Sequence, residues 1–313
     1  MLFPVLSKNF KHERDDNIKF EEEGHKYTIV PDSTSTYTSV TTFIHSHFQP
    51  FEADKIIEKM MKGKLWKEGH KYWNMTAEEI KSQWTQNGNN VSQLGTSMHY
   101  EFECFMNNPS LPIEYTHKEL YEYYVNANNK ANNKNTDNKN NDNKNTDNKN
   151  TNNIDDFNTT KEWHITKEWQ FFLHFIKDFP NLKPYRTEWT IYHEDLKLAG
   201  SIDMVYENPD KTLSIYDWKR VKNITRINHF NSYAITDSIC HIPDSNFWHY
   251  TLQLNIYKAI LEERYNKVIS ELYLVRIHPD SEENNYELIK LPILTNEIKD
   301  LFNERKKLIQ EKA

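Results

Sequence analysis

The chain has only two cysteines, Cys104 and Cys240, in 313 residues. A disulfide scaffold, a four-thiolate zinc site and a cysteine-held iron–sulfur cluster each need more thiolates than this. We therefore expect no iron–sulfur cluster. So few cysteines are also typical of a protein that works in a reducing, intracellular compartment.

Long apolar runs and an excess of positive charge are absent as well. No segment approaches the roughly 18 consecutive apolar residues of a membrane span, and the N-terminus lacks the apolar core of a signal peptide. We expect a soluble protein without a membrane partner. Acidic residues interrupt the basic Lys8, Lys11 and Arg14, which counts against mitochondrial import but leaves nucleus, cytoplasm and viral factory open. Since the net charge is −7, binding to nucleic acid would need a local basic strip.

Aromatic side chains are plentiful, with 8 Trp, 18 Tyr and 16 Phe, so the chain can bury a sizeable core. One tract cannot contribute to that core, because residues 126–156 consist mostly of Asn, Lys, Asp and Thr. Its lysines and aspartates balance, which predicts a neutral, disordered insertion. The rest divides into an N-terminal part, 1–90, packed on a core formed by 91–125 and 157–313.

Hydrophobic periodicity and capping residues predict the order of the helices and strands. Residues 18–30 should form two short strands, and Thr76 with Glu79 forms a capping box for a helix that Gly88 should end. From residue 91 on, the predicted core runs helix, strand, strand, strand, helix, strand. Its elements are a helix at 91–106, strands at 185–193, 198–206 and 213–219, a helix around 252–260 and a strand at 268–277, with further helices at 52–62, 169–179 and 297–308.

Two facing acids in the segment from Ala199 to Lys219 are the first sign of chemistry. If this hairpin is symmetric about Asp210, residues whose numbers sum to 420 face each other, which places Asp203 opposite Asp217. Facing side chains have Cβ atoms about 5 Å apart, where two negative charges repel unless a proton or a cation separates them. Because strands alternate faces, Lys219 lies on the same side as Asp217. The pattern predicts a divalent metal between the acids, with an ammonium beside it.

The other face of this hairpin should be apolar, since it carries Ile202, Met204, Tyr216 and Trp218. A weaker interpretation of the acids exists, because an Asp followed two residues later by a Lys is common and usually marks a solvated edge or a surface ion pair. The second acid at matching register, on an otherwise apolar hairpin, favours the metal site.

Four patches of sequence extend this site. They are Gly95-Thr96-Ser97-Met98-His99 with Glu103, Gly200-Ser201-Ile202-Asp203, Asp217-Trp218-Lys219, and Gln253-Leu254-Asn255-Ile256-Tyr257. In composition and order they resemble the motifs of the PD-(D/E)XK nuclease superfamily, in the RecB-like branch that contains stand-alone exonucleases of the mitochondrial genome maintenance type. The resemblance implies an α/β, restriction-endonuclease-like αβββαβ core with a mixed central sheet flanked by helices. One departure is Ile202, which stands where the superfamily's name has proline.

Carried over onto this sequence, the resemblance implies that His99, Asp203 and Asp217 bind the metal, with the main-chain carbonyl of Trp218 as a further ligand. Lys219 would orient or deprotonate the attacking water, so Lys219, Asp217 and Asp203 form the implied catalytic set. Carboxylate oxygens suit Mg²⁺ and imidazole also suits Mn²⁺, so either should support activity, with one or two ions bound.

Further positions have weaker support. Glu188, on the preceding strand, could hold a second ion or a metal-bound water, and an exposed strand glutamate is the alternative. Gln253 and Tyr257 share a helix face, which the resemblance places near nucleic acid together with Thr96. Arg220 and Lys222 supply a local basic strip for a phosphate backbone. Without the resemblance, ordinary surface positions would account for the helical pair.

The resemblance therefore implies a phosphodiesterase: a metal-dependent DNA nuclease, more an exonuclease than an endonuclease, acting on DNA ends or single strands in replication, repair or recombination. A structure-specific endonuclease or an RNA-processing nuclease is the alternative among enzymes. A non-catalytic nucleic-acid-binding protein that keeps the fold is the alternative outside them, although His99, Asp203, Asp217 and Lys219 are all present. No G-x-x-x-x-G-K-[S/T] loop occurs, so we expect no nucleotide cofactor. Cleavage polarity and oligomeric state stay open.

Overall fold

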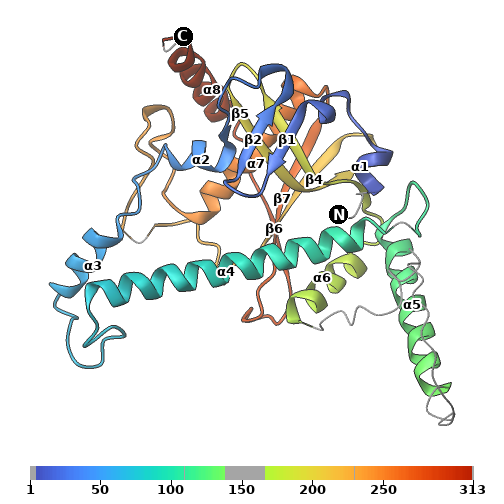
Figure 1. Ribbon diagram of the computed structural model, residues 1–313, viewed down its shortest axis with the longest axis horizontal. Helices are drawn as coiled ribbons and strands as arrows, with labels where there is room; N and C mark the ends of the chain where they lie inside the picture. Colours follow the sequence, from blue (N-terminus) through green and yellow to red (C-terminus); the bar gives the residue numbers. More distant parts are fainter. Residues whose placement is uncertain (1–4, 109, 138–165, 229, 312–313) are drawn as a thin grey trace, which may run out of the picture.

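An open, mixed β-sheet forms the centre of the molecule (Figure 1). The computed structural model describes residues 5–108, 110–137, 166–228 and 230–311. The strands of the sheet are β4 (Lys183–His193), β5 (Leu198–Glu207), β6 (Leu213–Lys219), β7 (Ile269–Arg276) and β8 (Glu287–Lys290), with the short β3 (Thr38–Ser39) beside the start of β5. β4 is antiparallel to β5, β5 to β6 and β7 to β8, whereas β5 is parallel to β3 and β6 is parallel to β7. The predicted mixed α/β class is confirmed.

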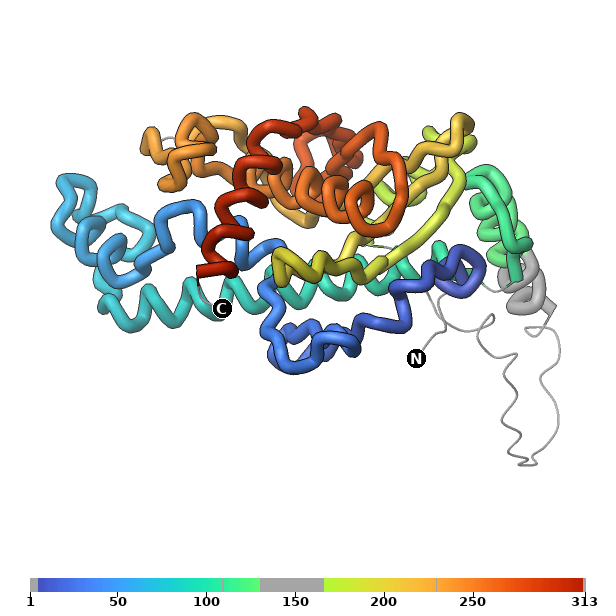
Figure 2. The backbone as a smooth tube through the Cα atoms, turned by 90° about the horizontal axis from the view of Figure 1, so that it is seen from above, coloured from blue at the N-terminus to red at the C-terminus, as the bar shows by residue number. Residues whose placement is uncertain are grey.

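Helices cover both faces of this sheet. One face is covered by α2 (Val40–His45), α7 (Asn246–Arg264) and α8 (Thr295–Gln310), and the other by α4 (Ala77–Met106), α5 (His117–Asp137) and α6 (Lys167–Asp178). Figure 2 shows α7, in orange, and α4, in cyan, on opposite sides of the yellow strands. Each interface has its own apolar core, so the sheet is buried on both sides.

The remaining elements lie around this three-layered core. They are α1 (Val5–Asn9), α3 (Ala53–Met61), the hairpin of β1 (Ile18–Glu21) and β2 (Lys26–Ile29), and the 3₁₀ turns η1 (Glu13–Asn17), η2 (Val30–Asp32) and η5 (Asp237–Ile239). From α4 onward, setting α5 and α6 aside, the chain runs α4, β4, β5, β6, α7, β7. The predicted order of helix, three strands, helix and strand is therefore confirmed, and β6 has the predicted bounds.

The helix α4 is longer than the sequence suggested. Thr76 and Glu79 form the predicted capping box at its start. The predicted end at Gly88 is wrong, because the helix continues without a break to Met106 and the boundary expected at residue 90 falls inside it. A glycine within a helix costs only about 1 kcal/mol, which thirty residues of continuous hydrogen bonding overcome.

The Asn-rich tract begins inside a helix. α5 runs to Asp137, so the prediction that residues 126–156 are disordered is wrong for 126–137. This helix starts in the core, where Leu120 is buried and the His117 ring is hydrogen-bonded to the Tyr206 hydroxyl. Once a helix is nucleated, each further residue extends it at little cost. Residues 138–156 lie outside the described part of the chain.

Candidate metal centre

The β5–β6 hairpin has the predicted register. Met204 faces Tyr216 and Val205 faces Ile215, and these pairs sum to 420. Asp203 and Asp217 are the next two residues beyond the pair formed by Met204 and Tyr216. The backbone N–H of Trp218 donates to Asp203 Oδ2 over 3.0 Å. The two acids are therefore held at the end of the ladder.

The apolar face of the hairpin differs from the prediction at one position. Met204, Tyr216 and Trp218 pack together toward α4 and α6, as expected, whereas Ile202 packs into the core on the α7 side. In the β4–β5 ladder, Thr187 pairs with Met204 and Trp189 pairs with Ile202, but the position between these pairs, where Glu188 lies opposite Asp203, is unpaired. This local irregularity breaks the strict alternation on which the prediction for Ile202 rested.

Three side chains converge at this break in the sheet. His99 from α4, Glu188 from β4 and Asp203 from β5 each offer a ligand atom, and these atoms all lie within 4.8 Å of one another. An imidazole nitrogen with two carboxylate oxygens is a donor set suited to Mn²⁺ and Mg²⁺. The structure thus brings together two of the implied ligands and the additional glutamate. Asp217 is not part of this group.

The ring of His99 is oriented by the hairpin. Its Nε2 lies 2.9 Å from the carbonyl oxygen of Trp218, which can only accept, so Nε2 carries the proton of this hydrogen bond. Its Nδ1 lies 3.5 Å from Asp203 Oδ2. In the neutral ring, the Nδ1 lone pair therefore faces the acids, as a metal ligand requires. The Trp218 carbonyl, predicted as a ligand, contacts the ring of His99.

Glu188 adopts an unusual backbone conformation for a strand residue. Its φ is +43°, in the left-handed region that non-glycine residues rarely occupy. Such strain of about 1–3 kcal/mol clusters at functional sites. Ser201 donates to its Oε2 over 3.0 Å. Burial, together with the charges of Asp203 and Glu103, raises the pKa of Glu188 well above its usual range.

Asp217 and Lys219 form an ion pair beside this cluster. Lys219 Nζ lies 2.6 Å from Asp217 Oδ2, and both side chains are largely buried. Burial and the charge of Asp203 raise the pKa of Asp217 to about 6, against the opposing influence of Lys219. Burial alone would lower the pKa of Lys219, but the charges of Asp217 and Asp203 raise it. Lys219 is therefore a cationic hydrogen-bond donor at neutral pH.

The helix α7 completes the surroundings. Gln253 Nε2 donates to the hydroxyl of buried Tyr257 over 3.1 Å, which confirms their shared face. The ring of Tyr257 lies so close to Gly200 that a Cβ there would be 2.6 Å from its Cε1. His99 contacts Trp218, Trp218 contacts Asp203, and Tyr257 packs on Gly200. All four sequence patches, far apart along the chain, therefore meet at one place.

The expected basic strip is only partly free. Arg220 makes an ion pair with Glu168 of α6, with 2.8 Å between Nη2 and Oε1. Lys222 is exposed and its side chain has no ion-pair partner among the described residues. Thr96 is exposed on α4, one turn before His99, and donates to the carbonyl of Ser92. Of the residues predicted to contact nucleic acid here, Lys222 and Thr96 are exposed, whereas Arg220 is held by Glu168.

The structure adds residues that the sequence did not single out. The ring of Tyr250 on α7 lies below the ammonium of Lys219, 4.7 Å from its centroid. Ser201 holds Glu188, as described above. Tyr250 precedes Gln253 by three residues and so shares its helix face, which was the one available signal. Nothing in the spacing connects it with Lys219, because that contact needs the tertiary packing.

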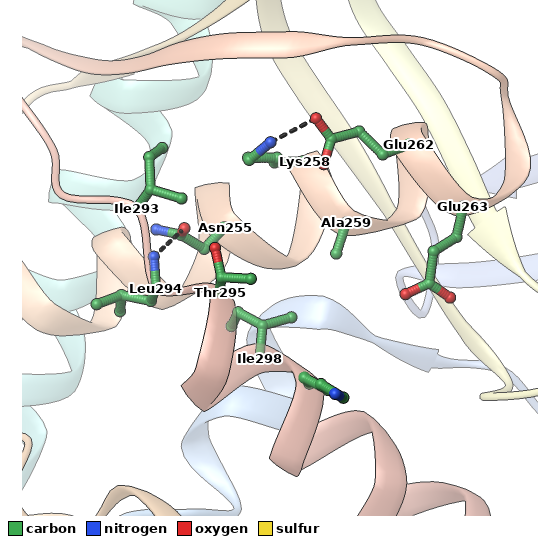
Figure 3. A pocket seen from close by; sticks show the side chains of 10 residues that line it. Asn255, Lys258, Ala259, Glu262, Glu263, Ile293, Leu294, Thr295 and Ile298 are labelled. Atoms are coloured by element: carbon green, nitrogen blue, oxygen red, sulfur yellow. Dashed lines mark hydrogen bonds and ion pairs between the residues drawn. The ribbon is translucent and has the colours of Figure 1, made fainter.

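A hollow lies on another side of α7. About 330 Å³ in volume, it opens between α7 and the start of α8 (Figure 3). Figure 3 shows Lys258 paired with Glu262, and Asn255 Oδ1 accepting from the backbone N–H of Leu294. These residues lie on the α7 face opposite Gln253 and Tyr257. The α7 residues of this hollow therefore face away from Gln253 and Tyr257, and the hollow is separate from the metal cluster.

The chain matches no protein-family model, and it matches no curated protein. Among the residues that the structure describes, no helix is both long and apolar enough to cross a membrane.

Proposed function

We propose that this protein is a metal-dependent nuclease, an exonuclease that hydrolyses phosphodiester bonds of DNA at ends or in single strands. One observation carries the proposal: a three-donor cluster of His99, Glu188 and Asp203 lies beside the buried ion pair of Asp217 and Lys219. A cation site next to a positioned ammonium is what cleavage of an anionic phosphodiester requires. The resemblance to the PD-(D/E)XK superfamily supports the same chemistry and the choice of DNA.

The residues present fit a divalent ion. Glu188 and Asp203 lie beside an imidazole nitrogen, and burial together with the charge of Asp203 raises the pKa of Glu188, so a cation held there would offset the repulsion between the two carboxylates. In the proposal, His99 Nδ1, Glu188 and Asp203 hold Mg²⁺ or Mn²⁺. When bound, the ion would lower the pKa of a water and polarise a phosphoryl oxygen.

The chain's own residues have separate parts in the proposed reaction. Trp218 orients His99 through its carbonyl and Asp203 through its N–H. Asp217 holds the ammonium of Lys219, and this contact gives Asp217 a positioning role beside the ligand role that the resemblance implies. Lys219 then donates hydrogen bonds to the attacking water or to a phosphate oxygen, where negative charge grows in the transition state.

The test is cleavage of end-labelled single- and double-stranded DNA and RNA by the purified chain, with Mg²⁺, Mn²⁺ or EDTA. Lys219→Met should lower kcat by about 10²-fold or more, the loss typical for one electrostatic donor. Asp203→Asn should abolish the cleavage that Mg²⁺ or Mn²⁺ supports in the wild type. Lys211→Met is the matched control, because Lys211 is an exposed lysine in the turn of the same hairpin, where it pairs with Glu207.

Two results would overturn the proposal. One is cleavage that persists unchanged in EDTA, and the other is Lys219→Met cleaving as fast as Lys211→Met. Release of mononucleotides from a labelled end would support an exonuclease, whereas cleavage of a closed circle would favour the endonuclease alternative. Faster cleavage of RNA than of DNA would refute the proposed choice of substrate.

A further inference from the structure

A small hollow lies between α2 and α7, close to the proposed catalytic lysine. Its volume is about 160 Å³, below the roughly 300–1,000 Å³ of sites that enclose drug-sized ligands. It therefore has room for one small ring system. Its lining side chains come mainly from Thr41, Ile44 and His45 of α2 and from His249, Tyr250 and Gln253 of α7.

Tyr250 joins this hollow to the proposed reaction centre. One side of its ring faces Lys219 Nζ, as described above, and the same residue lines the hollow. Gln253, the next lining residue along α7, is hydrogen-bonded to Tyr257, which packs on the strand that carries Asp203. A group held in the hollow is thus a neighbour of whatever Lys219 binds.

The lining carries no Lys, Arg, Asp or Glu. It combines aromatic or apolar surfaces, from Tyr250, the imidazoles and Ile44, with polar edges. Among the described residues, the Tyr250 hydroxyl, the Gln253 carbonyl oxygen and the His45 ring make no hydrogen bond. A phosphate would find no cation inside this hollow, whereas a flat, neutral heterocycle would find ring surface and hydrogen-bonding partners.

The rest of the lining is held in place. His249 Nε2 lies 2.9 Å from Asp244 Oδ1, and its ring lies against Phe48 with 4.1 Å between centroids. Asn246, at the rim, accepts from the N–H of Thr225 and donates to the carbonyl of Asn223. The walls are therefore preorganised by contacts that do not use the free polar edges, which lowers the cost of binding.

We propose that this hollow receives the nucleobase of the nucleotide next to the scissile phosphodiester. The inference rests on the proposed nuclease function and adds a substrate contact to it: Lys219 faces the phosphate while Tyr250, Gln253 and His45 contact the base. A base can enter the hollow only when it is unpaired, because the base of a duplex has both faces stacked and its edge hydrogen-bonded. The site would then act on single strands or frayed ends.

The first test measures binding without cleavage. Calorimetry with thymidine 5′-monophosphate and with 2-deoxyribose 5-phosphate, which lacks the base, compares the wild type with Thr41→Trp. Thr41 is exposed on the rim, so its replacement fills the hollow while leaving the core intact. The control is Thr42→Trp, because Thr42 is an exposed neighbour on α2 that does not line the hollow.

We expect the nucleotide to bind at least about tenfold more tightly than the sugar phosphate, the typical contribution of one stacked base. This preference should disappear in Thr41→Trp and persist in Thr42→Trp. Equal binding of the two ligands to the wild type, or an unchanged preference in Thr41→Trp, would overturn the inference.

The second test separates the inference from the proposed function. A single-stranded DNA carries one abasic nucleotide at successive positions, and kcat/KM is measured for each bond. We expect a drop of about tenfold or more at one position beside the scissile bond in the wild type and in Thr42→Trp, but no such position in Thr41→Trp. Metal-dependent cleavage that ignores the abasic position would refute the base site alone. Absence of cleavage of any polynucleotide would refute the nuclease function.

Discussion

Replacing a glycine by alanine should have opposite effects on stability at two positions in this chain. At Gly200, a Cβ would lie 2.6 Å from Cε1 and 3.1 Å from the hydroxyl oxygen of Tyr257. The pairing of β5 with β3 ends at Ala199, and its pairing with β6 begins at Met204. On its other side Gly200 pairs with Ile191 of β4, and the ring of Tyr257 is buried, so both the strand and the ring are restrained.

The two expected magnitudes follow from these surroundings. Overpacking of a rigid core costs about 1–3 kcal/mol, so Gly200→Ala should destabilise the protein by that amount. Gly88 is exposed in the middle of α4 and a Cβ there would meet nothing within 4 Å. Gly88→Ala should therefore stabilise the protein, by up to about 1 kcal/mol, because alanine favours the helix.

Urea denaturation followed by circular dichroism measures both changes. A double-mutant cycle tests the mechanism: it compares Gly200→Ala, Tyr257→Leu and the variant that carries both changes. The added methyl group should cost little once the ring is gone, so the effects of Gly200→Ala and Tyr257→Leu on stability should be non-additive by about 1 kcal/mol or more, as expected for residues in contact. The reasoning fails if Gly200→Ala leaves the denaturation midpoint unchanged, or if the double variant is the simple sum of its parts.

Two further predictions concern buried polar groups. Burial lowers the pKa of His117 to about 3. The unfolded chain therefore binds a proton that the folded chain does not, so stability is full above about pH 6.5 and falls by roughly 1.4 kcal/mol per pH unit below it. In His117→Asn the loss between pH 6.5 and 4.5 should be smaller by about 2–3 kcal/mol, and parallel denaturation curves for the two proteins would contradict this. Asp15 accepts from buried Arg186 over 2.7 Å and from Trp189 over 3.0 Å, so Asp15→Ala should destabilise the protein by about 3–5 kcal/mol. The exposed Asp16, changed to Ala, is its control, and equal midpoints for the two variants would refute the importance of the buried pair.

The hairpin shows how much of the site could be predicted from the sequence. Strand alternation and a short turn were sufficient to pair Asp203 with the end of β6, because both are local properties. Ile202 was misplaced because β5 does not alternate strictly at Asp203: Ile202 and Met204 pack on opposite faces, and the neighbouring residue of β4, Glu188, has a positive φ. No sequence pattern announces such a residue, because its conformation is imposed by the surrounding structure.

Two other differences have the same origin in tertiary structure. Gly88 was predicted to end a helix because glycine is common at helix ends, but here it occupies an ordinary helical position. Tyr250 was not predicted, because its significance comes from contact with Lys219 across two elements. Periodicity predicts which face a residue occupies, whereas its partner depends on how the elements pack.

The continuous helix α4 has a mechanical consequence. With 30 residues it is on the order of 45 Å long. From Met98 onward it is anchored by buried side chains, and Figure 1 shows its first half extending beyond the sheet toward α3. Near its other end Ile80 is also buried, but there α4 packs against α3 rather than against the sheet. His99 lies in the part of α4 that is anchored on the sheet, so a bend in the outer half would displace α3 and leave the imidazole beside Trp218.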